Sequence, residues 1–115
     1  MILPVPRDKL DQRSIEHLDR LRSGSFLLSR EELKDPNFTS AVVLICAFSD
    51  DGAYGLVINR PSHMPLSEVF DAELISREGK RRIFVGGPVR QEVLQILMIT
   101  QQAPENAYQV APGVF

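Results

Sequence analysis

The feature that most constrains the fold is a pair of apolar segments joined by a short acidic turn. The first, TSAVVLICAF at residues 39–48, has an unbroken β-branched centre, and the second, YGLVINR, covers residues 54–60. The linker Ser-Asp-Asp-Gly-Ala supplies residues that tolerate the positive φ values of tight hairpin turns. We therefore predict an antiparallel hairpin. The lack of polar alternation in the first segment predicts a strand that is buried on both faces.

Three residues within GAYGLVINRP have particular structural consequences. Gly52 is predicted to form the hairpin turn. Gly55 lies inside a strand, where glycine marks a β-bulge or a close approach of another part of the backbone. Pro61 has no backbone N–H and favours extended geometry at Arg60, so strand pairing is predicted to stop there.

Weaker patterns predict the remaining elements. Apolar residues at near-helical spacing predict amphipathic helices over residues 8–22 and 65–76, which Gly24 and Gly79 end. Short apolar runs predict strands at residues 25–29, 92–100 and 108–115. A further strand is predicted to enter a Gly-Gly-Pro turn within residues 83–89.

Composition places the chain among ordinary globular proteins. It has 115 residues, of which 43% are hydrophobic and 24% charged, and its net charge of −2 would not attract nucleic acid or an anionic membrane. No apolar stretch approaches the ~20 residues that span a bilayer, and the prolines of MILPVPRDKL interrupt the apolar run that a signal peptide needs. The single cysteine, Cys46, suits a reducing compartment. We expect a soluble cytoplasmic protein that does not contact a membrane.

Three segments together resemble the AlgH-like (YqgE) family of bacterial proteins. GSFLLSREELKDPNFTSAVVLIC is similar to the opening segment of that family, GAYGLVINRP matches its most specific motif, and IFVGGPV matches its Gly-Gly-Pro-Val turn. The resemblance extends from Gly24 to Phe115, so we expect an AlgH-like domain at residues 24–115 and an N-terminal extension with an amphipathic helix at residues 1–23. Family members continue into a Gly/Trp-rich segment and a further helix, which implies that this chain is a truncated or divergent member.

The resemblance implies an α+β fold in which a bent, largely antiparallel sheet or barrel is flanked by helices. It implies no activity, because the family is functionally uncharacterised and only its name suggests a putative transcriptional regulator. Members usually have Glu-His after the cysteine, where this chain has Ala47 and Phe48. That departure removes a polar pair that could have activated the Cys46 thiol.

The candidate site residues form two groups. Cys46 is the one possible redox residue or nucleophile, and its apolar neighbours favour a structural role in a buried strand. Convergence of Asn59 and Arg60 with Gly86 and Gly87 would place a guanidinium beside exposed backbone amides, which is an arrangement that binds small anions.

Other chemistry finds little support in the sequence. His17 and His63 lack the spacing of a metal site, and no motif indicates a cofactor. The basic residues Arg77, Lys80, Arg81 and Arg82 have no interleaved aromatic residues, so direct nucleic acid binding is not expected. We therefore favour a non-enzymatic regulatory or interaction protein that acts through a protein partner or a small anionic ligand. The alternative is an anion-binding or Cys46-dependent enzyme or redox protein.

Overall fold

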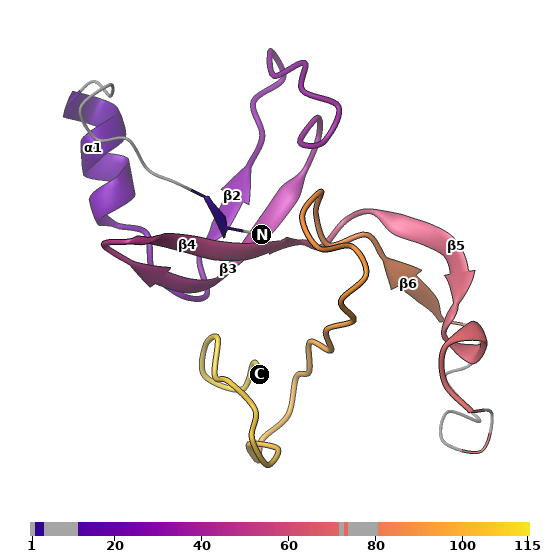
Figure 1. Cartoon of the computed structure of the whole chain (residues 1–115). Coiled ribbons are helices and arrows are strands. Elements are labelled where there is room, and N and C mark those ends of the chain that lie inside the picture. The colour runs from indigo at the N-terminus through magenta and orange to yellow at the C-terminus, as the bar shows by residue number, and fades with distance from the viewer. Residues whose placement is uncertain (1, 4–11, 72, 74–80) are drawn as a thin grey trace.

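The computed structural model describes residues 2–3, 12–71, 73 and 81–115. Its main element is a four-stranded antiparallel sheet in the order β1-β4-β3-β2, formed by Ile2–Leu3, Gly52–Val57, Val42–Ser49 and Phe26–Leu28. A second sheet pairs β5 (Pro61–Pro65) with β6 (Arg82–Phe84). The two sheets lie side by side (Figure 1), since only a short connection separates the end of β4 from the start of β5.

The predicted hairpin is confirmed and forms the centre of the molecule. Strands β3 and β4 pair antiparallel, and their turn closes with Ser49 opposite Gly52, whose φ is +147°. One face of the hairpin holds a buried cluster, and a second cluster lies on the opposite face. The first cluster consists of Ala41, Val43, Ile45, Ala53 and Val57. The second consists of Leu44, Cys46 and Val110. The prediction of a strand buried on both faces is therefore also confirmed.

Gly55 has the close contact that its position in a strand predicted. The pairing register shifts between Ile45 and Ala47, so Cys46 is an extra, bulged residue of β3 opposite Gly55 and Tyr54. A Cβ atom on Gly55 would lie 2.7 Å from Val43 Cγ1 and 3.1 Å from the Leu44 carbonyl oxygen. The hairpin therefore has room for glycine alone at this position.

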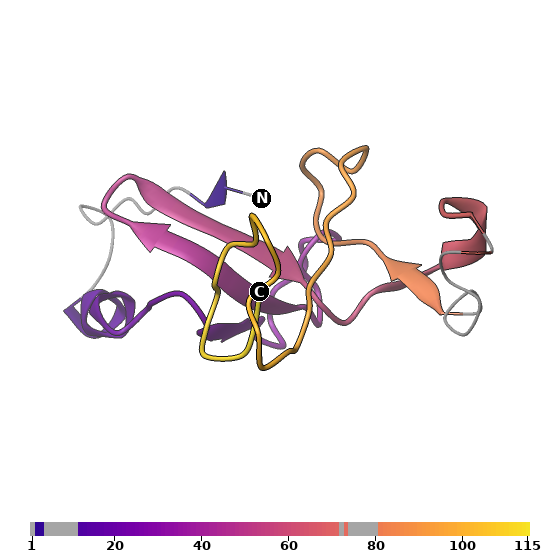
Figure 2. The same ribbon diagram turned by 90° about the horizontal axis from the view of Figure 1, so that it is seen from below.

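The C-terminal segment covers the second cluster. Residues 98–100 and 113–115 form a short antiparallel pairing, with hydrogen bonds from Met98 N to Phe115 O (2.7 Å), from Thr100 N to Gly113 O (2.9 Å) and from Phe115 N to Met98 O (2.9 Å). Val110 and Val114 from this region pack against Leu44 and Cys46. Figures 1 and 2 show this loop beneath one face of the main sheet.

The predicted α+β class, with a bent sheet or barrel flanked by helices, is wrong. The described residues form two small antiparallel sheets, a single α-helix, α1 (Gln12–Asp19), and one 3-10 turn, η2 (Leu66–Glu68). Within that part of the chain, helix α1 makes no extensive contact with any strand, and Figures 1 and 2 show it to one side of the turn end of the β3–β4 hairpin. Neither sheet closes into a barrel.

Both predicted helices are shorter than the sequence pattern suggested. Of the helix predicted at 8–22, residues 8–11 lie outside the described residues, and the helix ends at Asp19. The helix predicted at 65–76 is reduced to η2, and residues 72 and 74–76 lie outside the described residues. No residue of η2 is buried, and Val69 beyond it is 47% exposed. A short helix without a packed face is marginal in water, which explains the loss.

Two predicted strands are also absent. Residues 92–100 are in neither sheet, and only Ile99 makes an isolated bridge, to Val114. Within residues 108–115, residues 111–114 form a tight turn in which Ala111 bridges Val114. A strand needs a neighbour as well as an apolar pattern, and these segments have little pairing available. Within the described residues, no helix has the length and apolar character that crossing a membrane would require.

Candidate functional site

Asn59 and Arg60 both bind the turn that precedes β3. The Asn59 side-chain oxygen accepts a hydrogen bond from Val42 N (2.9 Å), and its amide nitrogen donates to Ser40 O (2.8 Å). Arg60 Nη2 donates to Thr39 O at 2.9 Å. Ser40 has a φ of +52°, a conformation that is uncommon for a residue with a side chain. The Asn-Arg pair therefore stabilises a strained turn.

The Gly86-Gly87 segment lies beside the same part of the chain. Val57 N donates to Gly86 O at 2.7 Å, and Val85 N donates to Arg60 O at 2.8 Å. The backbones of the two predicted motifs are thus adjacent, as the anion hypothesis requires. However, Gly86 uses its carbonyl rather than an amide toward β4. Anion binding by Asn59, Arg60, Gly86 and Gly87 stays a prediction.

Cys46 is buried, as its sequence context predicted. Its side chain is 6% exposed, and the thiol donates weakly to Leu44 O at 3.6 Å. Burial raises the pKa of the Cys46 thiol above its ordinary value. Little thiolate therefore forms near neutral pH, and the thiolate is the reactive species. These properties suit packing inside the second cluster, and a redox role stays a prediction.

Ser23 is a structurally important residue that sequence reasoning missed. Its hydroxyl lies 2.7 Å from the carbonyl oxygen of the bulged Cys46 and 2.6 Å from that of Val110. A hydroxyl has one proton, so it donates to one carbonyl at a time or shares the proton between both. Ser23 thereby links the N-terminal segment, the β3 bulge and the C-terminal segment. No sequence signal beyond its place before Gly24 marks it.

The structure describes only some of the remaining polar candidates. Among the described residues, no group of three or more His, Cys, Asp or Glu side chains is placed to hold a metal ion. His63, Arg81 and Arg82 are exposed, whereas the side chains of His17, Arg77 and Lys80 are outside the described part of the chain.

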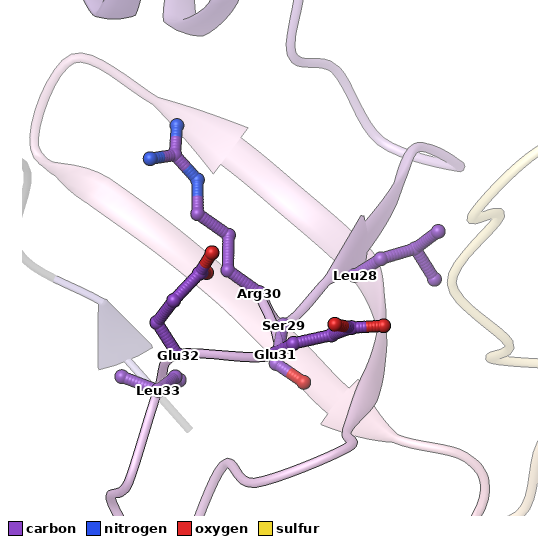
Figure 3. A pocket seen from close by; sticks show the side chains of 6 residues that line it. All are labelled: Leu28, Ser29, Arg30, Glu31, Glu32 and Leu33. Carbon is purple, nitrogen blue, oxygen red and sulfur yellow. The ribbon is translucent and has the colours of Figure 1, made fainter.

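A surface hollow lies beside the loop that follows β2. It is lined by six consecutive residues, Leu28, Ser29, Arg30, Glu31, Glu32 and Leu33. Figure 3 shows that their side chains point in different directions and do not face a common centre. Ser29 Oγ is already engaged, because it accepts a hydrogen bond from Ala41 N at 2.9 Å. This hollow has no set of converging groups that would recognise a small molecule.

The edge of β2 is the clearest open surface in the main sheet. The backbone groups at positions 25 and 29 form hydrogen bonds on the β3 side. Ile45 N donates to Ser25 O (2.8 Å), and Ser29 N donates to Ala41 O (3.1 Å). Backbone groups alternate along an antiparallel strand, so those of Phe26 and Leu28 face away from β3. No described residue pairs with that edge.

Apolar side chains stand beside the same free edge. Phe26 is 59% exposed and Leu28 is 73% exposed, and both lie on the face of the sheet that carries Leu44. The apolar run at residues 25–29 predicted this strand, but it could not predict that the strand ends the sheet.

The comparisons with a family model and with known proteins agree on one family. A model of the AlgH-like family matches residues 26–115. The chain is 34% identical over 92 residues to a UPF0301 protein of Hahella chejuensis, covering 79% of this chain and 50% of the relative. It is 30% identical over 95 residues to a UPF0301 protein of Chlorobaculum tepidum, covering 83% and 49%. No solved structure matches the chain significantly.

The extent of the matches differs between this chain and its relatives. A UPF0301 protein of Mycobacterium avium is 30% identical over 112 residues, which are 97% of this chain and 54% of the relative. The chain thus spans about half the length of the curated relatives that it matches. The family model covers most of the chain, from the start of β2 to Phe115. The chain therefore belongs to the AlgH-like family, whose UPF0301 members are uncharacterised.

Proposed function

We propose that this chain is a non-enzymatic interaction protein that binds an extended segment of a protein partner along the free edge of β2. The observation that carries the proposal is the combination of outward-facing backbone groups with exposed Phe26 and Leu28. A regulatory role, which the family name suggests, would be exerted through that partner.

Strand addition explains why this surface suits a peptide. A peptide that adds to a sheet edge gains main-chain hydrogen bonds, and its alternate side chains give specificity. Phe26 and Leu28 are two residues apart and lie on one face, so they would contact alternate residues of the added strand. Natural edge strands are commonly protected by charge or proline, and β2 has neither within Phe26–Leu28.

The fixed hydrogen bonds of the polar candidates also support an interaction protein over an enzyme. Both polar atoms of the Asn59 side chain are bonded to the backbone, and Arg60 holds Thr39. Cys46 is buried with a raised pKa. These contacts support a structural role for each of the three side chains.

A peptide selection tests the proposal although the partner is unidentified. The probe is a displayed library of random peptides, selected against the purified chain. We expect enriched peptides with apolar residues at alternate positions, because strand side chains repeat every two residues. Leu28→Lys should weaken their binding at least tenfold. The matched control Tyr108→Lys, at a position that is 64% exposed, should leave binding unchanged.

Two results would contradict the proposal. One is the absence of any enriched peptide. The other is a set of peptides that bind Leu28→Lys and the unmodified chain equally well.

A further inference from the structure

The C-terminal segment is held in shape by its own backbone hydrogen bonds. Met98 and Phe115 exchange hydrogen bonds in both directions, at 2.7 and 2.9 Å, and Thr100 N donates to Gly113 O at 2.9 Å. Among the described residues, the backbone-to-backbone bonds of positions 98–115 all join positions within this segment. We call residues 98–115 the cover, because they lie against one face of the main sheet (Figures 1 and 2).

The cover buries little apolar surface against the sheet. Val110 is 7% exposed and is the one buried residue of the cover. Together with the half-buried Val114, it packs against Leu44 and Cys46. The other buried apolar side chains among the described residues lie between positions 41 and 57. Segments with few buried apolar contacts are those that open locally while the rest of a protein stays folded.

The Ser23 hydroxyl joins the cover to the hairpin. Ser23 Oγ lies 2.6 Å from Val110 O in the cover and 2.7 Å from Cys46 O in the β3 bulge. The hydroxyl has one proton for these two acceptors. When the cover moves away, the proton remains available to Cys46 O, and water can reach Val110 O. The movement therefore leaves neither carbonyl buried without a donor, which is the usual penalty for separating hydrogen-bonded groups.

From these observations we infer that the cover opens and closes as a unit over the face of the hairpin that carries Leu44 and Cys46. Ser23 stabilises the closed form. The hairpin stays folded during opening, because its first cluster is formed by residues 41–57 on the opposite face. Opening exposes the Cys46 thiol, which serves here as a reporter. The inference needs no partner, so it does not depend on the proposed function.

Labelling of Cys46 in the unmodified chain tests the inference. The probe is iodoacetamide, added to the purified full chain at increasing urea concentrations. Opening of the cover exposes little surface, so the labelling rate at low urea should be nearly independent of urea. The rate should rise steeply only where global unfolding, followed by circular dichroism, becomes the faster route. This measurement needs no variant.

Two serine variants test the part played by Ser23. Ser23→Ala leaves both carbonyls without their donor in the closed form, whereas water can reach them in the open form. It should raise the labelling rate at low urea about tenfold. Ser62→Ala is the matched control, because the Ser62 hydroxyl donates to Ile83 O at 2.6 Å in the second sheet. It should leave that rate unchanged.

Amide exchange distinguishes opening as a unit from unravelling of the cover. In Ser23→Ala, the amides of Met98 and Phe115 should exchange as slowly as in the unmodified chain, because their partners move with them. Three results would overturn the inference. They are a labelling rate that follows global unfolding at every urea concentration, equal low-urea rates in Ser23→Ala and Ser62→Ala, and faster exchange of the Met98 and Phe115 amides in Ser23→Ala.

Discussion

At the scale of single residues, the polar side chains that follow β4 form hydrogen bonds with the backbone before β3. Asn59 is the clearest example, because it bonds both Val42 N and Ser40 O across the start of β3. Asn59→Ala should destabilise the chain by about 1 kcal/mol, the usual net effect of lost hydrogen bonds at an exposed site. Urea unfolding monitored by circular dichroism measures the change. A free energy of unfolding equal to that of the unmodified chain would mean that the turn holds without Asn59.

Arg60 provides the sharpest test of the anion hypothesis. If its guanidinium binds an anion beside Gly86-Gly87, sulfate should raise the melting temperature, and Arg60→Ala should abolish that rise. The variant also loses the bond to Thr39, so the informative quantity is the sulfate-dependent increment alone. Arg90→Ala is the control, because Arg90 is exposed and pairs only loosely with Glu92 at 3.6 Å. An equal increment in Arg60→Ala would exclude the predicted site.

The raised pKa of the buried Cys46 thiol predicts how the stability of the chain depends on pH. Burial raises the pKa of its thiol in the folded state, so the unfolded chain loses the proton first. The contribution of Cys46 to stability is therefore complete below pH 9.0, the ordinary thiol pKa, and is lost as pH rises through the folded-state pKa. Cys46→Ala should flatten this alkaline loss in urea unfolding series. A slope equal to that of the unmodified chain would assign the loss to other groups.

At the scale of elements, the β3–β4 hairpin was predictable because local signals agree with each other. The apolar runs, the Asp-Gly turn and Gly55 all indicate the same pairing. The bulge at Cys46 was not predictable from β3 alone, because a bulge is defined by the register of two strands. The helix predicted at 65–76 has consistent local signals, but the structure shows only the short turn η2 there. Its apolar pattern is helical, but no residue of η2 is buried.

Gly55 gives the element-scale prediction. Gly55→Ala should destabilise the hairpin by about 1–3 kcal/mol, because the added methyl would lie 2.7 Å from Val43 Cγ1. Gly86→Ala is a matched control in which the methyl meets only the flexible Leu56 Cδ2, at 3.2 Å. Its cost should be below about 1 kcal/mol. Equal costs for the two variants in thermal unfolding would contradict the close approach at Gly55.

The candidate surfaces show where sequence reasoning reaches its limit. Strand residues 25–29 and the apolar segment 92–100 were both recognised as β-forming. Whether each has a neighbour depends on the order β1-β4-β3-β2 and on the course of the C-terminal chain. Those are long-range properties that no local pattern encodes. The contacts of Ser23 with Cys46 and Val110 were missed for the same reason.

At the scale of the whole molecule, the described residues combine a buried centre with exposed apolar side chains on the surface. The hairpin buries two clusters, whereas β2 and residues 93–99 leave apolar side chains and backbone groups uncovered. The exposed side chains of β2 are the basis of the proposal that the chain binds an extended segment of a partner.

The most direct test of strand addition at the free edge of β2 is amide exchange at Phe26 and Leu28. It is measured by NMR with and without a peptide selected on the chain. If the peptide adds as a strand to β2, these two amides should become protected, because they face the free edge. The Ser29 amide, which already donates to Ala41 O, should be unchanged. Exchange at Phe26 and Leu28 that stays equally fast with bound peptide would contradict strand addition at this edge.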